Sequence, residues 1–212
     1  IGGVLGTLPT TIVPAAMGMY VEAGADDLGT SMSLIPFWML LNALFVASWV
    51  VYPRLKRSVT LIEMTLVSLS FWSVLALLMT LSLTQVLNYL SELVVGIIGF
   101  VCLVSLGLWM TWVPINAPRG KNKVTKQVLL LRGLAAGTAI GFAVHLASLG
   151  LPIIAGLASV FPAIFLTTMV ALWMALGADV PTGAAGPMML GGSSVAMYSL
   201  IAPWAIPEYG IY

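Results

Sequence analysis

Charged residues are scarce in this chain, and their scarcity excludes most soluble folds. Of 212 residues, 60% are hydrophobic and only 7% are charged, whereas an ordinary soluble domain has about 25% charged residues. The formal net charge of +1 is too small for long-range attraction to nucleic acid, so we expect no nucleic-acid partner. The composition instead predicts an integral membrane protein whose partner is membrane lipid.

Cysteine and histidine are also rare, and this limits the chemistry that the chain can perform. The one cysteine, Cys102, can form no disulfide within the chain, and the one histidine, His145, does not suffice for a metal site. We therefore expect no metal and no cofactor. General acid/base catalysis needs paired titratable groups, and no such pair is evident, so we do not expect an enzyme. The chain begins at Ile1 without a charged leader, and we expect part of the N-terminus to be missing.

Apolar stretches of about 20 residues, long enough to cross the hydrocarbon core as helices, recur along the whole sequence. They predict an all-α fold, a polytopic transmembrane helix bundle of about seven spans. The predicted spans cover residues 1–21, 34–52, 59–81, 93–113, 128–149, 152–176 and 188–204.

The basic residues fall in two segments, 54–57 and 119–132, which seven spans place on one side of the membrane. The positive-inside rule makes this the cytoplasm-like side for the basic loops 54–57 and 119–126. A loop with Glu22, Asp26 and Asp27 then faces the opposite side. Several tryptophans lie towards span ends, as in an aromatic belt: Trp38, Trp49, Trp109, Trp112 and Trp204.

An internal repeat links the two ends of the chain. At a shift of 153 positions, Pro9 aligns with Pro162, and Gly24-Ala25-Asp26 aligns with Gly177-Ala178-Asp179. With two residues fewer, Pro36 meets Pro187, Asn42 meets Ser193 and Ser48 meets Ser199. The matched spans are five crossings apart, and an odd number reverses their direction, so the sequence predicts two inverted-topology repeats. Many secondary transporters have this architecture.

The repeat suggests how the chain is organised. We expect residues 1–212 to form a single membrane domain. Within it, residues 1–82 are the first repeat, which lacks its opening helix, residues 83–127 are a linker helix with a basic loop, and residues 128–212 are the second repeat.

Local patterns in both repeats resemble the GlpM-like family of small bacterial inner-membrane proteins. The resemblance rests on Ala155-Gly156-Leu157 with Phe161-Pro162-Ala163, and on the counterparts Gly2-Gly3-Val4 and Leu8-Pro9-Thr10. It continues through Pro36, the span ending at Tyr52, the basic segment 53–57 and Glu63. The family unit has four helices, so the resemblance implies a duplicated unit and carries no chemistry.

Polar residues inside the predicted spans are the candidates for a substrate-binding site. Asn42 and Ser193, with the neighbouring Ser194, lie at matched depths, and we interpret them as a central polar site or as an interhelical hydrogen bond. Pro9 and Pro162, with nearby glycines including Gly156, should loosen or break their helices. The hydroxyls beside these breaks could bind solute or satisfy freed carbonyls: Thr10, Thr11, Thr167 and Thr168.

Ionisable residues provide further candidates. His145 lies within a predicted span and is a functional hypothesis on that ground, although a neutral packing histidine is the alternative. Asp26 and Asp179 end matched helices and are either loop caps or gating residues on opposite faces. Glu63 should pair with the basic cluster after the second span. The small residues 183–186 and Gly191-Gly192 favour close helix packing.

These patterns favour a transporter or channel for a small, uncharged or weakly polar solute, working by movement of the inverted halves. The alternative is a structural or accessory subunit of a larger membrane complex, in contact with other membrane subunits or as a homo-oligomer. The shortage of charge within the spans disfavours proton coupling unless His145 serves.

Overall fold

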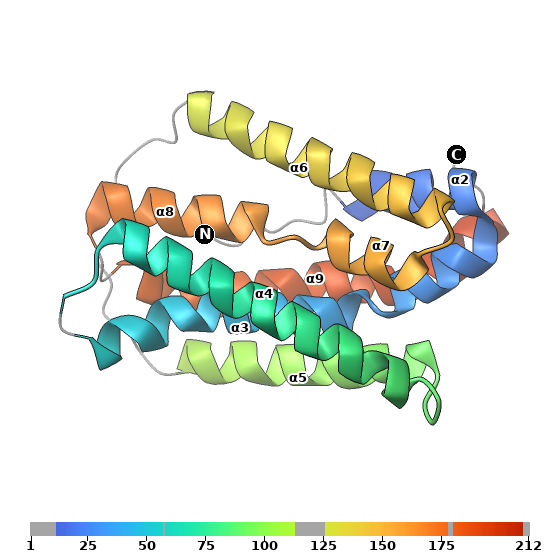
Figure 1. Cartoon of the computed structure of the whole chain (residues 1–212), viewed down its shortest axis with the longest axis horizontal. Helices are drawn as coiled ribbons and strands as arrows, with labels where there is room; N and C mark the ends of the chain where they lie inside the picture. Colours follow the sequence, from blue (N-terminus) through green and yellow to red (C-terminus); the bar gives the residue numbers. More distant parts are fainter. Residues whose placement is uncertain (1–11, 57, 113–125, 178–179, 210–212) are drawn as a thin grey trace.

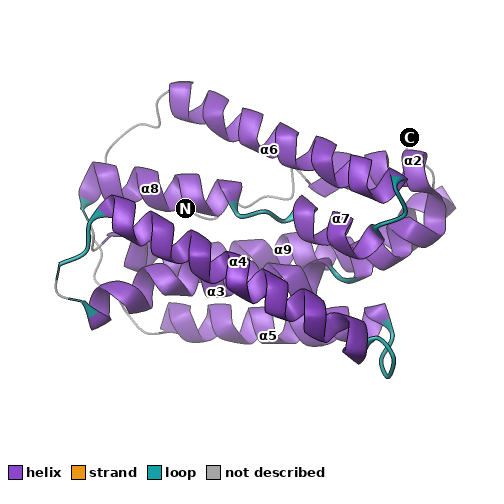
Figure 2. Cartoon of the chain, in the orientation of Figure 1, coloured by secondary structure: helices purple, strands orange, loops and turns teal. Residues whose placement is uncertain are grey.

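The computed structural model describes residues 12–56, 58–112, 126–177 and 180–209, and every regular element among them is a helix (Figure 2). In chain order the helices are α2 (Ile12–Ser33), α3 (Ile35–Leu55), α4 (Leu61–Val86), α5 (Glu92–Trp112), α6 (Lys126–Ser148), α7 (Pro152–Ser159), α8 (Ala163–Leu176) and α9 (Val180–Tyr209). The all-α prediction is therefore confirmed over the described part of the chain.

Five segments of the described residues are long and apolar enough to cross a membrane: Gly24–Leu55, Leu61–Val86, Glu92–Trp112, Gly156–Met174 and Gly183–Tyr209. They correspond to five of the seven predicted spans, and the chain is a multi-span membrane protein. Of the first predicted span, residues 1–11 lie outside the described part, and Ile12–Glu22 forms a shorter apolar helix. The remaining predicted span is helical as α6, although it is not among the five.

The second span begins earlier than its apolar run suggested, and the predicted acidic loop is helical. Gly24 has φ 85° and ψ −176° inside α2, a conformation that is essentially restricted to glycine, and the chain bends there. Asp26 and Asp27 then lie in the first turn of the helical segment that continues towards α3. Carboxylates suit a helix N-terminus because the backbone N–H groups there carry partial positive charge.

The sixth predicted span is interrupted, as its proline predicted. The chain leaves the helix at Val160 and resumes it at Ala163, with Pro162 as the residue before α8. Gly156, which we also expected to loosen this span, lies within α7 instead. A Cβ at Gly156 would be 3.0 Å from the Ser31 carbonyl oxygen and 3.4 Å from Trp38 Nε1, so the glycine permits close packing against α2 and α3.

Helix α5 packs against both α3 and α9, which also pack against each other. Its glycines allow the backbones to touch, because a Cβ at Gly96 would be 2.0 Å from the Ser33 carbonyl oxygen and one at Gly99 would be 2.6 Å from Phe37 Cα. On the other side, a Cβ at Gly186 of α9 would be 2.8 Å from the backbone nitrogen of Thr111. The predicted packing role of the small residues in α9 is thus confirmed.

Two tryptophans that we assigned to an aromatic belt lie in the core. Trp38 and Trp49 are both 0% exposed, whereas Trp109, Trp112 and Trp204 are exposed. The assignment of Trp38 and Trp49 was wrong because both side chains are buried against other helices. Trp38 also lies well inside its segment, which starts at Gly24 rather than near residue 34, and Trp49 packs against Trp173 of α8.

The directions of the helices can be followed in Figure 1. Helices α3 and α9 run in opposite directions, and α5 lies beside them. The connection from α3 to α4 and the beginning of α6 lie at the same end of the molecule. This end carries Arg54 in the last turn of α3, Lys56 directly after α3, and Lys126 as the first residue of α6.

Candidate functional site

Asn42 forms a buried polar contact at the interruption between α7 and α8. Its side chain is 2% exposed. The amide Nδ2 donates a hydrogen bond of 2.6 Å to the carbonyl oxygen of Val160, which lies in the break. In the other direction, Trp72 Nε1 of α4 donates to Asn42 Oδ1 at 2.9 Å. One side chain of α3 therefore joins α4 to the interrupted helix.

The ring of Trp72 completes this contact. It packs edge to face against Phe161, the residue after Val160, with the ring centroids 5.4 Å apart. An amide buried without partners would cost about 1–3 kcal/mol for each unsatisfied group. Here the donor and the acceptor of Asn42 are both used. We refer to Asn42, Trp72, Val160 and Phe161 as the Asn42 cluster.

Ser193 and Ser194 are not part of the Asn42 cluster. Ser193 Oγ donates to the Leu190 carbonyl oxygen at 2.5 Å, and Ser194 Oγ donates to the Gly191 carbonyl oxygen at 2.7 Å, both within α9. No hydrogen bond between described residues joins Asn42 to Ser193. The neighbouring Gly192 faces α3, since a Cβ there would be 2.8 Å from Met39 Cε.

The threonines beside the predicted breaks have separate positions. Thr167 Oγ1 donates to the carbonyl oxygens of Ala163 and Ile164 at 2.8 and 3.2 Å, within the first turn of α8. Thr167 thus satisfies carbonyls of its own helix. Thr168 is half-buried. Thr10 and Thr11 lie outside the described residues.

The described ionisable candidates are exposed, whereas Asn42 is buried. His145 is exposed near the end of α6, and Asp26 is exposed after the bend of α2. Asp179 lies outside the described residues. Within the described part of the chain, no group of three His, Cys, Asp or Glu residues could hold a metal ion.

Glu63 pairs with the basic end of α3, as predicted, and its partner is Lys56. Glu63 Oε1 accepts from Lys56 Nζ at 2.5 Å and from the Tyr52 hydroxyl at 2.6 Å. The hydrogen bond to Glu63 raises the pKa of the Lys56 ammonium. Thr60 begins α4 by accepting the Glu63 backbone N–H on its hydroxyl. These contacts close the turn between α3 and α4 at the membrane surface.

Two indole N–H groups near the interrupted helix have no acceptor among the described residues. They belong to the fully buried Trp38 and Trp49. We did not single out either nitrogen from the sequence, nor did we predict that Trp72 would bind Asn42. The spacing of Trp38, Asn42, Phe45 and Trp49 was the available signal, because steps of four, three and four residues mark one face of a helix.

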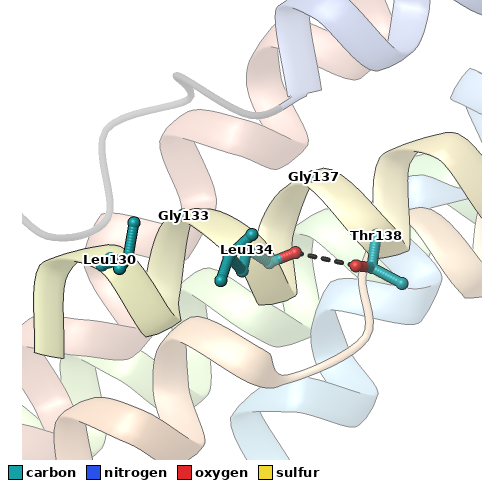
Figure 3. A pocket seen from close by; sticks show the side chains of 5 residues that line it. All are labelled: Leu130, Gly133, Leu134, Gly137 and Thr138. Carbon is teal, nitrogen blue, oxygen red and sulfur yellow. Dashed lines mark hydrogen bonds between the residues drawn. The ribbon is translucent and has the colours of Figure 1, made fainter. Parts of the chain in front are cut away.

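An open depression of about 570 Å³ lies on α6, away from Asn42. Its described lining comes from one face of the helix (Figure 3): Leu130, Gly133, Leu134, Gly137 and Thr138. The Thr138 hydroxyl donates to the Leu134 carbonyl oxygen at 2.9 Å. Among the described residues, nothing lies within 4 Å of the position that a Cβ would take at Gly133, Gly137 or Gly141, so this face of α6 is open to that part of the chain.

Comparisons with protein-family models, curated proteins and solved structures found no match. The resemblance to GlpM-like proteins therefore rests on the quoted sequence patterns alone, and function has to be argued from the geometry.

Proposed function

We propose that this protein is a transporter for a small, uncharged or weakly polar solute, and that it works by movement of two inverted halves about the Asn42 cluster. The observation that carries the proposal is the interruption between Ser159 and Ala163, whose Val160 carbonyl is held by a buried side chain from another helix. Interrupted spans, with polar backbone near the midplane, form the solute sites of many secondary transporters.

The backbone at two matched glycines supports an inverted repeat. Gly24 has φ 85° and ψ −176°, and Gly177, which is 153 positions later, has φ 89° and ψ 176°. At both positions a helix ends at the glycine and a longer helical segment follows, which leads into α3 in one case and forms α9 in the other. The opposite directions of α3 and α9 (Figure 1) agree with inversion.

The place of α5 supports its role as the linker between the halves. It contacts the end of α2 through Gly96 and α3 through Gly99, and it contacts α9 through Gly107 and Thr111. Helix α5 thus lies between the two proposed repeats in the sequence and packs against a helix of each, α3 and α9.

The charge distribution supports a neutral solute. Residues 35–53 of α3 and all of α7 and α8 contain no charged side chain. An ion beside these helices would have no counter-charge, and uncompensated charge in the hydrocarbon region costs several kcal/mol, roughly 3 on the scale of insertion measurements.

Uptake into liposomes tests the proposal. The full chain is reconstituted, and swelling is followed by light scattering with urea, erythritol and N-methylacetamide as neutral probes. We expect the wild type to admit at least one probe faster than protein-free liposomes do, and Asn42→Leu to slow that uptake. Ser82→Ala is the matched control, because Ser82 is exposed and bonds only its own helix at Leu78. Equal rates for wild type and Asn42→Leu would reject the site.

Topology provides a second test. In a Cys102→Ser background, we expect single cysteines at Arg54 and Lys126 to react with a membrane-impermeant maleimide from one side, and a cysteine at Asp26 from the other. The end of α3, the start of α4 and the start of α6 lie at the same end of the molecule in Figure 1. Labelling of Arg54→Cys and Lys126→Cys from opposite sides would reject the inverted arrangement.

The open face of α6 favours a second candidate function, that of a subunit in a membrane complex or homo-oligomer. Gly133, Gly137 and Gly141 recur every four residues with open space at each Cβ position, and such spacing permits close contact between membrane helices. Under this alternative, the purified chain admits no probe, and Gly137→Leu dissociates it from a fixed partner or from a second copy. Unchanged association in Gly137→Leu would argue against it.

A further inference from the structure

One face of α3 presents a row of N–H donors to the interrupted helix. Trp38 lies against α7, where a Cβ at Gly156 would be 3.4 Å from Trp38 Nε1. Asn42 donates to Val160 in the break. Trp49 packs edge to face against Trp173 of α8, with ring centroids 5.9 Å apart. The row therefore follows the interrupted helix from α7, past the break, to α8.

Only the central donor of this row has an acceptor among the described residues. Trp38 Nε1 and Trp49 Nε1 are buried without one, although each side chain is 0% exposed. Trp72, which approaches from α4, shows the usual arrangement, because its indole N–H is bonded to Asn42 Oδ1. Folded proteins rarely leave buried donors unpaired, and each exception calls for an explanation. Two exceptions on one face, on either side of Asn42, have a common explanation if an acceptor comes from outside the chain.

The surroundings define the chemistry of that acceptor. Neither α7, α8 nor residues 35–53 supplies a charge to balance an ion. The walls are apolar and aromatic: Phe37 packs edge to face on Trp38, Phe45 does so on Trp49, and Trp173 covers Trp49. Indole nitrogens donate and do not accept. This combination fits a neutral molecule that carries oxygen acceptors and apolar edges.

We infer that Trp38 and Trp49 are solute-binding residues, and that the solute class is a small neutral molecule with hydrogen-bond acceptors. The inference rests on the proposed function, in which the interrupted helix moves relative to α3. In the packed state, α7 lies against the Trp38 indole nitrogen and Trp173 of α8 lies against the Trp49 ring. Trp38 and Trp49 are 11 residues, about 16 Å, apart along α3, so one small molecule does not reach both. When α7 and α8 move away, the acceptor atoms of the solute bond to Trp38 on one side of Asn42 or to Trp49 on the other, as two successive positions along one path.

Indole resonances test the binding directly. The full chain is prepared in lipid nanodiscs with ¹⁵N-labelled indoles, assigned by single Trp→Phe variants, and is titrated with urea, erythritol and N-methylacetamide. We expect the Trp38 and Trp49 N–H resonances to start at unbonded positions and to move downfield saturably with at least one neutral probe. Choline, a cation, should move neither. Trp109 and Trp112, which are 64% and 86% exposed, are internal controls.

Two results of the titration would overturn the inference. The first is that both resonances already have hydrogen-bonded shifts before any probe is added, which would mean that the protein or a fixed water supplies the acceptor. The second is that no neutral probe moves either resonance.

A donor-free isostere tests the role of the same groups in transport. Benzothienylalanine keeps the shape of tryptophan and replaces its N–H by sulfur. We expect Trp38→benzothienylalanine and Trp49→benzothienylalanine each to slow probe uptake about tenfold, and Trp109→benzothienylalanine to leave it unchanged. If the wild type takes up a probe and both core replacements match it, the inference is wrong and the proposed function stands. If the wild type takes up none, but the two resonances shift saturably, the binding site stands and the transport proposal is wrong.

Discussion

The region from α2 to α3, which we call the front region, and the region from α7 to α9, the back region, share one backbone feature. They differ in the side chains around it. Both contain a glycine with positive φ, Gly24 or Gly177, between two helical segments. Asn42 of α3 reaches across to another helix, whereas Ser193, which aligns with it, bonds its own helix in α9. Two positions that align in the proposed repeat therefore make different contacts. The polar contact at the break comes from the front region alone.

The front region also has buried tryptophans at positions where the back region has none. Trp38 and Trp49 are buried on α3. The α9 residues aligned with them are Met189 and Leu200, which have no donor. The front region therefore supplies the hydrogen-bond donors, and the back region supplies the interrupted helix that they face. The following predictions test this division.

The largest expected effect concerns the contact of α5 with the front region. Gly96→Val places side-chain atoms where a Cβ is already 2.0 Å from the Ser33 carbonyl oxygen. Because backbone must move, we expect a loss of more than about 3 kcal/mol, beyond ordinary overpacking, and little folded protein in detergent. Gly133→Ala is the control, since its Cβ position is open. A melting temperature for Gly96→Val equal to that of the wild type would contradict the packing of α5 on the end of α2.

The next effect compares Asn42 with Ser193. Asn42→Leu leaves the Val160 carbonyl and the Trp72 indole without partners, so we expect a loss of about 2–5 kcal/mol from two unsatisfied buried groups. Ser193→Ala removes a hydroxyl that bonds its own helix, and we expect a change within about 0.5 kcal/mol. Denaturation followed by circular dichroism in detergent measures both. Equal losses would show that the two positions are equivalent after all.

The matched glycines should respond alike. Gly24 and Gly177 have φ 85° and 89° with open space at each Cβ position, so alanine is opposed by backbone strain rather than by a clash. We expect Gly24→Ala and Gly177→Ala each to cost about 1–3 kcal/mol. Gly29→Ala, also on α2 with an open Cβ position and without a positive φ, should be neutral or slightly stabilising. A loss at only one of the two glycines would break the correspondence between the regions.

The smallest effect is expected at the turn between α3 and α4. Lys56 has its pKa raised above 10.5 by Glu63, so the pair contributes below pH 10.5 and the contribution is lost as pH rises through the raised pKa. Because Lys56 is half-exposed, Glu63→Gln should produce only a small fall in melting temperature, which shrinks in high salt and stays constant between pH 7 and 9. A large, salt-independent fall would indicate another role for Glu63.

Much of the fold could be predicted from sequence because lipid makes simple demands. A span must be apolar and helical, so α4 and α5 were predicted closely, and Pro162 predicted the interruption before α8. The prediction of an acidic loop was wrong because Asp26 and Asp27 follow the bend at Gly24 and begin a helical segment. The belt assignment of Trp38 followed from the same misplaced boundary, whereas that of Trp49 was wrong because Trp173 of another helix covers it.

The candidate site could be predicted only in part. Asn42 was identified because an amide in a membrane span needs partners, and an interhelical hydrogen bond was one of the two alternatives. Its actual partners, Val160 and Trp72, are 118 and 30 residues away, and no local pattern encodes such distances. The prediction that Ser193 shares a site with Asn42 was based on alignment, which gives equivalent depth but not the direction of a side chain.

The sequence by itself determined that the chain is helical and lies in lipid, and that Pro162 interrupts a span, because these properties depend on composition and on single residues. Only the tertiary structure decided which side chain satisfies the broken helix and which indole N–H groups stay unpaired. Those outcomes depend on how α3, α4, α7 and α8 approach one another. The approach is set by packing between residues far apart in the chain.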